Sequence, residues 1–91
     1  MTSDRVEQIR ALLQDRLQPL ELTVLDESAA HVGHRGAAGG GGHFRARIVS
    51  TRFCGLTLVQ RHRLVHDALA PLFASQIHAL ALQAICPDDD L

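Results

Sequence analysis

The chain contains no lysine, and all nine of its basic residues are arginine. A phosphate-binding P-loop ends in Gly-Lys followed by Ser or Thr, so the glycine run Gly39–Gly42 cannot be one. The G-x-S-x-G pattern of a nucleophile elbow and the H-E-x-x-H pattern of a zinc protease are also missing. These absences exclude several common classes of enzyme.

Long apolar runs and an excess of one charge are missing as well. No stretch approaches the ~18 apolar residues of a membrane span, and an N-terminus with Asp4 and no apolar run before Val6 carries no recognisable targeting signal. The net charge of -1 and the pI of about 6.6 provide no cationic field that would concentrate a polyanion. We therefore expect a cytoplasmic protein that does not enter a membrane and whose default partner is not nucleic acid.

Cysteine is scarce, with only Cys54 and Cys86 present. Two cysteines are too few to staple a small secreted fold, and these two are too far apart in the sequence to form a metal knuckle. We interpret them as ordinary thiols in a reducing compartment. Cys54 lies near His62 in the sequence, but nothing indicates an orienting third group or an oxyanion hole, so we do not expect a cysteine hydrolase.

The length of 91 residues, 46% of them hydrophobic, provides material for a single core. A chain this short buries only roughly 60 to 65% of its unfolded surface, which leaves little stability to spare for a deep catalytic cavity. We predict one domain over residues 1–86, followed by an acidic, solvated tail over residues 87–91. A role in binding is therefore favoured over catalysis.

The first half of the chain predicts a helix and a β-hairpin. Apolar residues recur at helical spacing over about residues 4–17 and stop before a proline. Alternating apolar and polar residues predict two antiparallel strands, one over about residues 20–28 and one around residues 44–48. Six of the seven glycines fall between these strands, which predicts a long flexible loop over residues 29–42.

The second half predicts a helix and a third strand. Thr57 and Gln60 form a capping box ahead of an apolar helical pattern that bends or ends near Pro71. The apolar run Ile77–Ile85 has the length of a strand, and a right-handed crossover would place it parallel to the second strand. The predicted fold class is α+β, with the order α-β-β-α-β and helices packed on one face of a three-stranded mixed sheet.

Six histidines are unusual for this length, and His31, His34 and His43 flank or lie within the glycine-rich loop. His31 and His34 are three residues apart, but no C-x-x-C motif accompanies them, so we do not expect a closed structural zinc site. Strand alternation places His78 on the face of Leu80 and Leu82. His78 is then either a structural histidine at a strand end or a ligand, and the residues alone leave both interpretations open.

Several short motifs together resemble the BolA family over about residues 4–86. The combination of H-F, V-S-x-x-F-x-G, R-H-R and H-A-L is more specific than any of its parts. The segments that carry the resemblance are Glu27-Ser28, His31–His34, His43-Phe44, Ile48–Ser50, Phe53–Gly55, Arg61–Val65 and Ile77–Leu80.

The resemblance implies a class II KH-like core and a monothiol glutaredoxin as partner, with no enzymatic activity. BolA-like proteins form heterodimers with such glutaredoxins, and the heterodimer can hold a [2Fe–2S] cluster to which the glutaredoxin and glutathione supply thiolates. The H-A-L position implies His78 as a ligand, and the loop position implies His31, with His34 as the alternative. We expect no cofactor in the isolated chain. Cluster trafficking and iron sensing both remain open as roles.

The chemistry of imidazole suits such a site. Replacing thiolates by neutral histidines makes a cluster less negative and raises its reduction potential, as in Rieske centres. Imidazole also competes with protons near pH 6 to 7, so the cluster is released more easily than one held by cysteine alone. The flexible loop would allow His31 to reach iron held mainly by a partner.

The resemblance also implies an alternative function, because some BolA-like proteins are described as transcription regulators of cell shape and stress response. Arg61, His62 and Arg63 on the predicted second helix are either a solvated face or a docking patch for an acidic surface or phosphate. In a DNA complex, Arg61, Arg63, Arg45 and Arg47 would contact phosphates. Gly33–Gly36 matches the letters of a KH G-x-x-G clamp, but it lies between strands and not between helices. Interaction through the domain surface without metal is a third hypothesis.

Overall fold

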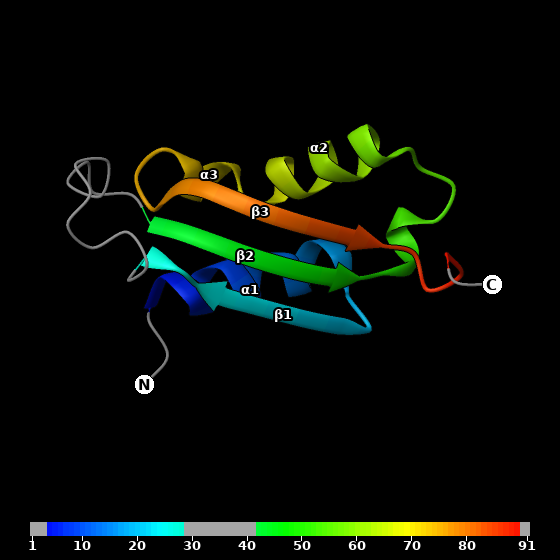
Figure 1. Ribbon diagram of the computed structural model, residues 1–91, viewed down its shortest axis with the longest axis horizontal. Helices are drawn as coiled ribbons and strands as arrows, with labels where there is room; N and C mark the ends of the chain where they lie inside the picture. Colours follow the sequence, from blue (N-terminus) through cyan, green and yellow to red (C-terminus); the bar gives the residue numbers. More distant parts are fainter. Residues whose placement is uncertain (1–3, 29–41, 90–91) are drawn as a thin grey trace.

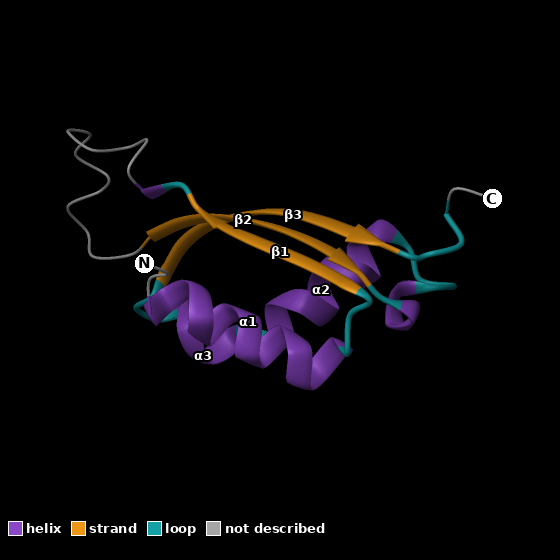
Figure 2. Ribbon diagram, turned by 90° about the horizontal axis from the view of Figure 1, so that it is seen from below, coloured by secondary structure: helices purple, strands orange, loops and turns teal. Residues whose placement is uncertain are grey.

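A computed structural model describes residues 4–28 and 42–89 as one three-stranded sheet with its helices on a single face (Figures 1 and 2). The helices and strands follow in the order α1, β1, β2, η3, α2, α3 and β3, where η3 is a short 3-10 helix. The predicted α-β-β-α-β layout is therefore confirmed. The predicted loop over residues 29–42 lies outside the described residues except for Gly42.

Helix α1 (Asp4–Leu17) has the predicted bounds and packs against the sheet. Its apolar residues are spaced by three or four positions, so they share one face and bury it. After the helix, Gln18 adopts a left-handed backbone with φ of 46°, and Pro19 cannot continue the helical hydrogen bonding. The buried side chains of α1 are Val6, Ile9, Leu13 and Leu17.

The sheet consists of β1 (Glu21–Asp26), β2 (Gly42–Val49) and β3 (Ile77–Ile85), with β2 in the centre. β1 pairs antiparallel with β2, and β3 pairs parallel with β2. The predicted orientation of each pair is confirmed. The last residue of β2, Val49, pairs with Glu21 on one side and with Ile85 on the other, so the end of β2 is held from both sides.

The central strand β2 separates the core from the open face of the sheet. Phe44, Ala46 and Ile48 are buried beneath the helices, while Arg45 and Arg47 alternate with them and are exposed on the other face. Figure 2 shows that the α-helices lie on the same side of the sheet. Among the described residues, nothing therefore covers the opposite face along β2.

The two α-helices between β2 and β3 begin and break where the sequence predicted. Helix α2 (Leu58–Ala68) begins at a capping box in which the Gln60 N–H donates to Thr57 Oγ1 over 3.1 Å and the Thr57 N–H donates to Gln60 Oε1 over 2.9 Å. Helix α3 (Ala70–Phe73) contains Pro71 in its first turn, and this break confirms the predicted end of the longer helix. None of the helices in residues 4–28 and 42–89 combines the length and the apolar character that a membrane span requires.

Cys54 and Cys86 form a disulfide, so the interpretation of two separate thiols is wrong. The sequence places them 32 residues apart, but parallel pairing of Val49 with Ile85 brings the ends of β2 and β3 together. Cys86 directly follows β3, and Cys54 directly follows η3 (Thr51–Phe53), which succeeds β2. Their Cα atoms are 4.9 Å apart, within the usual range for a disulfide.

The sequence predicted a solvated acidic tail, but Asp89 of this tail is bonded to the rest of the fold. The Asp89 carboxylate accepts a hydrogen bond from Arg61 Nη1 over 2.7 Å and one from the Cys86 backbone N–H over 3.0 Å. The tail thus contributes a side chain that ties the end of β3 to helix α2. Asp90 and Leu91 lie outside the described residues.

Candidate functional site

The rings of His43 and His78 lie side by side at the end of the sheet where β2 and β3 begin. Their centroids are 5.1 Å apart and their planes meet at 47°. His43 is partly buried, and His78 is exposed. Each imidazole carries two ring nitrogens that can bind a proton or a metal, so this end of the sheet gathers a pair of potential nitrogen ligands.

The backbone of His43 is held by the end of β1. Its N–H donates to Ser28 Oγ over 3.0 Å, and its carbonyl accepts a hydrogen bond from the Glu27 N–H over 2.8 Å. The Ser28 N–H in turn donates to Asp26 Oδ1 over 2.9 Å. These three bonds fix the position from which the His43 ring extends.

His78 occupies an irregularity in the pairing of β2 with β3. Gly42 pairs with Ile77, whereas the next residue of β2, His43, pairs with Ala79. His78 is therefore the extra residue of a β-bulge, a feature that redirects a side chain within a sheet. Ile77 is buried in the core at 3% exposure, and both residues that follow it are exposed.

The bulge overturns the face that strict alternation predicted for His78. Leu80 and Leu82 are partly buried and pack against the core. His78 instead is exposed and contacts the ring of His43. Alternation failed at this residue because it assumes an uninterrupted ladder, and the register shift adds one residue to β3.

Gly42 permits the close packing behind the histidine pair. A Cβ atom at this position would lie 2.6 Å from Phe44 Cε2 and 2.9 Å from Ser28 Oγ. Phe44 is buried and cannot readily yield. Only glycine therefore fits between the first core residue of β2 and the hydroxyl that holds His43.

His31 and His34, predicted from the sequence as loop ligands, lie outside the described residues. The segment that carries them joins Ser28 to Gly42, and both of these residues lie next to His43. His43 was not among the site residues predicted from the sequence. The H-F motif could have identified it. Because Phe44 is buried against the helices, the side chain of the preceding residue, His43, lies on the opposite face of the sheet.

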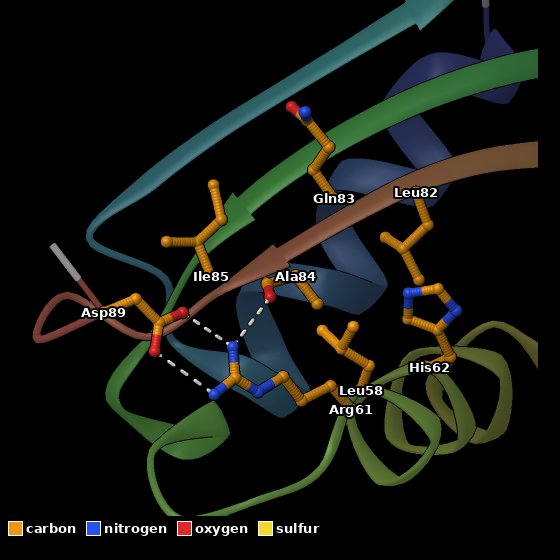
Figure 3. Close-up of a pocket in the computed structure, with 8 residues that line it drawn as sticks. All are labelled: Leu58, Arg61, His62, Leu82, Gln83, Ala84, Ile85 and Asp89. Carbon is orange, nitrogen blue, oxygen red and sulfur yellow. Dashed lines mark hydrogen bonds and ion pairs between the residues drawn. The ribbon is translucent and has the colours of Figure 1, made fainter.

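A second candidate is a groove of about 400 Å³ between the start of α2 and the end of β3 (Figure 3). In Figure 3 the His62 ring points toward Leu82, while Arg61 points toward Asp89. Leu58 on the rim is among the most exposed large apolar residues, at 67%. The lining residues are Leu58, Arg61, His62, Leu82, Gln83, Ala84, Ile85 and Asp89.

Arg61 is bonded within the fold and its side chain is only 11% exposed. It donates to both carboxylate oxygens of Asp89, over 2.7 and 3.3 Å, and to the carbonyl oxygens of Ala84 and Leu56, each over 3.1 Å. The hydrogen bond to Asp89 raises the pKa of Arg61 above its ordinary value. The hydrogen bonds from Arg61 and from the Cys86 backbone lower the pKa of Asp89. Arg61 therefore serves the fold and is not an open phosphate ligand.

His62 and Arg63 are the exposed members of the R-H-R triplet. On the open face of the sheet, Arg45 pairs with Glu27 at 3.2 Å and Arg47 with Glu21 at 3.6 Å. Three of the four arginines that the DNA hypothesis nominates thus already have a carboxylate partner. Arg63 has no ion pair within residues 4–28 and 42–89.

A model of the family described as BolA-like protein matches residues 13–89 of this chain. BolA-like protein 1 of Mus musculus is 48% identical over 79 residues, which cover 87% of this chain and 56% of the mouse protein. A protein of Vibrio cholerae described as DNA-binding transcriptional regulator BolA is 46% identical over 74 residues, covering 81% of this chain and 67% of that protein.

Solved structures have the same fold. The BolA domain of SufE1 from Arabidopsis thaliana superimposes with a TM-score of 0.84 at 42% identity, covering 96% of each chain. BolA1 from the same plant gives a TM-score of 0.81 at 34% identity, covering 97% of this chain and 98% of that one. The chain spans about half the length of the mouse relative and 23% of the SufE-like protein 1, chloroplastic/mitochondrial, of Arabidopsis thaliana.

Proposed function

Because this chain belongs to the BolA-like protein family, we propose that it is a non-enzymatic cytoplasmic adaptor that docks a monothiol glutaredoxin and supplies histidine to a shared [2Fe–2S] cluster. The observation that carries the proposal is the exposed His78 ring, which the β-bulge turns out of the core and sets against His43. A histidine placed there only to fill the core would not need the bulge. Cluster trafficking and iron sensing both follow from such a role.

The donor chemistry of this end of the sheet fits the cluster. Imidazole nitrogen replaces thiolate on one iron of Rieske-type [2Fe–2S] centres, and it raises their reduction potential because it is neutral. The cluster would supply iron and sulfide for transfer, or a redox state for sensing. The chain's own residues would bind the cluster and orient its histidine ligands.

The residues have distinct roles in this proposal. His78 is the ligand from β3. The second ligand is His31, with His34 as the alternative, and both follow Ser28 in the sequence within a few residues. His43 positions the His78 ring through their contact, and its own backbone is anchored by Ser28. A rigid ligand on a strand and a second ligand from the segment after β1 would close on iron held mainly by the partner.

The experiment is a titration of a cluster-loaded monothiol glutaredoxin, with glutathione present, by this chain under anaerobic conditions. We expect the two proteins to co-elute in gel filtration and the visible circular dichroism of the cluster to change until the two are equimolar. Co-elution with an unchanged spectrum would favour docking without metal ligation and would contradict the ligand role. No co-elution would overturn the adaptor function altogether.

A second candidate function, DNA binding, is supported by the description of the Vibrio cholerae relative as a DNA-binding transcriptional regulator. In this chain Arg63 is the arginine of the triplet that remains open to a phosphate. DNA binding predicts an affinity that falls steeply with salt and weakens in Arg63→Ala. His66→Ala on the same helix is a matched control and should leave the affinity unchanged.

A further inference from the structure

Cys54, Cys86 and Asp88 gather at the end of β3 opposite to His78. One ligand-type atom from each, the two sulfurs and a carboxylate oxygen, all lie within 4.8 Å of one another. Within the described parts of the chain this is the one group of three such residues close enough to share a cation. The adaptor function makes no use of it.

The fold brings the three residues together from two separate segments. Cys86 and Asp88 follow β3, and Cys54 follows η3 after β2. The Asp88 N–H donates to Cys86 Sγ over 3.3 Å. A backbone donor aimed at sulfur is the kind of outer contact that orients a thiolate ligand and favours its charged form.

The surroundings leave Asp88 available as a ligand. The neighbouring carboxylate, Asp89, is bonded to Arg61 and to the Cys86 N–H, so its charge is compensated within the fold. Asp88 is exposed, Cys54 is partly buried, and Cys86 is 4% exposed. The group thus combines one buried sulfur, one more accessible sulfur and one exposed carboxylate, with their ligand-type atoms within 4.8 Å of one another.

We propose that Cys54, Cys86 and Asp88 form a redox-gated site for a thiophilic divalent cation of the zinc class. In the disulfide state neither sulfur is a thiolate, so the site is closed. A phosphine reductant and water cleave the S–S bond to give two thiols and the phosphine oxide. Binding of the cation then releases the two thiol protons and forms two metal–sulfur bonds.

The donor set matches the coordination preferences of zinc. Zn²⁺ takes thiolate and carboxylate ligands in a tetrahedral arrangement, and sites with three protein ligands leave the fourth position to water or another ligand. Two cysteines and one aspartate would form such an open site. The cation would then bridge the end of β3 to the turn after η3, in place of the disulfide.

The test uses Co²⁺ as a spectroscopic probe of the whole chain after reduction by a phosphine and removal of the phosphine without air. We expect one equivalent of Co²⁺ to give a sulfur-to-cobalt charge-transfer band in the near ultraviolet, which Zn²⁺ then displaces. The oxidised protein should give no such band. Cys54→Ser and Cys86→Ser should each weaken it strongly, and Asp88→Asn should raise the dissociation constant by about tenfold or more.

The double variant His43→Ala/His78→Ala separates this site from the histidine pair and should retain the band in full. Far-ultraviolet circular dichroism identifies any cysteine variant that fails to fold. If a cysteine variant fails to fold, the test instead compares the alkylation rate of the thiols of reduced wild type with and without Zn²⁺. Bound Zn²⁺ should slow this rate at least about tenfold. Absence of the band in reduced wild type, its presence in the oxidised protein, or its loss in the histidine double variant would overturn the proposal.

Discussion

His43 on β2 contacts His78 on β3 with a ring-centroid separation of 5.1 Å, although the two residues are not directly paired in the sheet. The contact exists because the bulge adds one residue to β3 and turns His78 away from the core. The same shift leaves Ile77 buried beside Gly42. The candidate ligand is therefore positioned by the register of the sheet as well as by its own place in the sequence.

We expect Gly42→Ala to disturb this arrangement. The added Cβ would meet the Phe44 ring at 2.6 Å, so the variant should lower the free energy of unfolding by about 1 to 3 kcal/mol. Because the Cβ also crowds Ser28 Oγ, the NMR signals of the His43 and His78 rings should shift. Urea unfolding and imidazole NMR provide the measurements.

Gly55→Ala is the matched control for this substitution. Gly55 has a φ of 83°, and a Cβ added there would meet nothing within 4 Å, so alanine should cost about 1 to 2 kcal/mol through backbone strain alone. The histidine signals should stay where they are. Equal shifts of these signals in both variants would contradict the role assigned to the packing of Gly42.

The Arg61–Asp89 pair should make stability depend on pH in the acid range. Hydrogen bonds from Arg61 and from the Cys86 N–H lower the pKa of Asp89 below the value of about 3.9 that it has when unfolded. This contribution to stability is thus present in full above pH ~4 and is lost as the pH falls through the lowered folded pKa. We expect Asp89→Asn to be less stable than wild type at neutral pH and to approach it in strong acid.

Asp15→Asn is the control for that charge change. The Asp15 carboxylate is 80% exposed and lies 3.9 Å from Arg16, a geometry that contributes little in water. The melting temperature of the Asp15→Asn variant should match that of wild type at every pH from neutral to strongly acidic. The assignment fails if the two variants lose stability equally, or if Asp89→Asn differs from wild type by the same amount at every pH.

The disulfide should stabilise the domain mainly by restricting the unfolded chain. It links residues 32 apart, and for a closed loop of that length the chain-entropy estimate is about 3 to 4 kcal/mol. Reduction in the presence of a chelator should lower the free energy of unfolding by up to that amount. The double variant Cys54→Ser/Cys86→Ser should match the reduced protein and should not respond to reductant. A double variant as stable as the oxidised wild type would contradict the estimate.

The sequence predicted those features that depend on local patterns. The bounds of α1, the capping box at Thr57 and the strand Ile77–Ile85 all rest on periodicity and on residues a few positions apart, and the structure confirms them. The parallel pairing of β3 followed from the helix that connects it to β2. Resemblance to the BolA family agreed with this topology.

Features that depend on the meeting of distant segments were missed. The Cys54–Cys86 bond and the carboxylate of Asp89 on Arg61 arise only when the ends of β2 and β3 lie together. The bulge at His78 comes from the register between two strands, and strict alternation along one strand cannot reveal it. His43 was overlooked for the same reason, because its partner lies in a strand more than thirty residues away.

The central claim, that His78 is a cluster ligand, is tested most directly by comparing His78→Ala with His66→Ala in complex with cluster-loaded monothiol glutaredoxin. Both histidines are exposed, but His66 stacks on Phe73 in the helical layer and lies outside the proposed site. Visible circular dichroism of the complex is the measurement. We predict that His66→Ala reproduces the wild-type spectrum, whereas His78→Ala returns the spectrum to that of the glutaredoxin alone. A wild-type spectrum from a His78→Ala complex that still co-elutes would contradict the account.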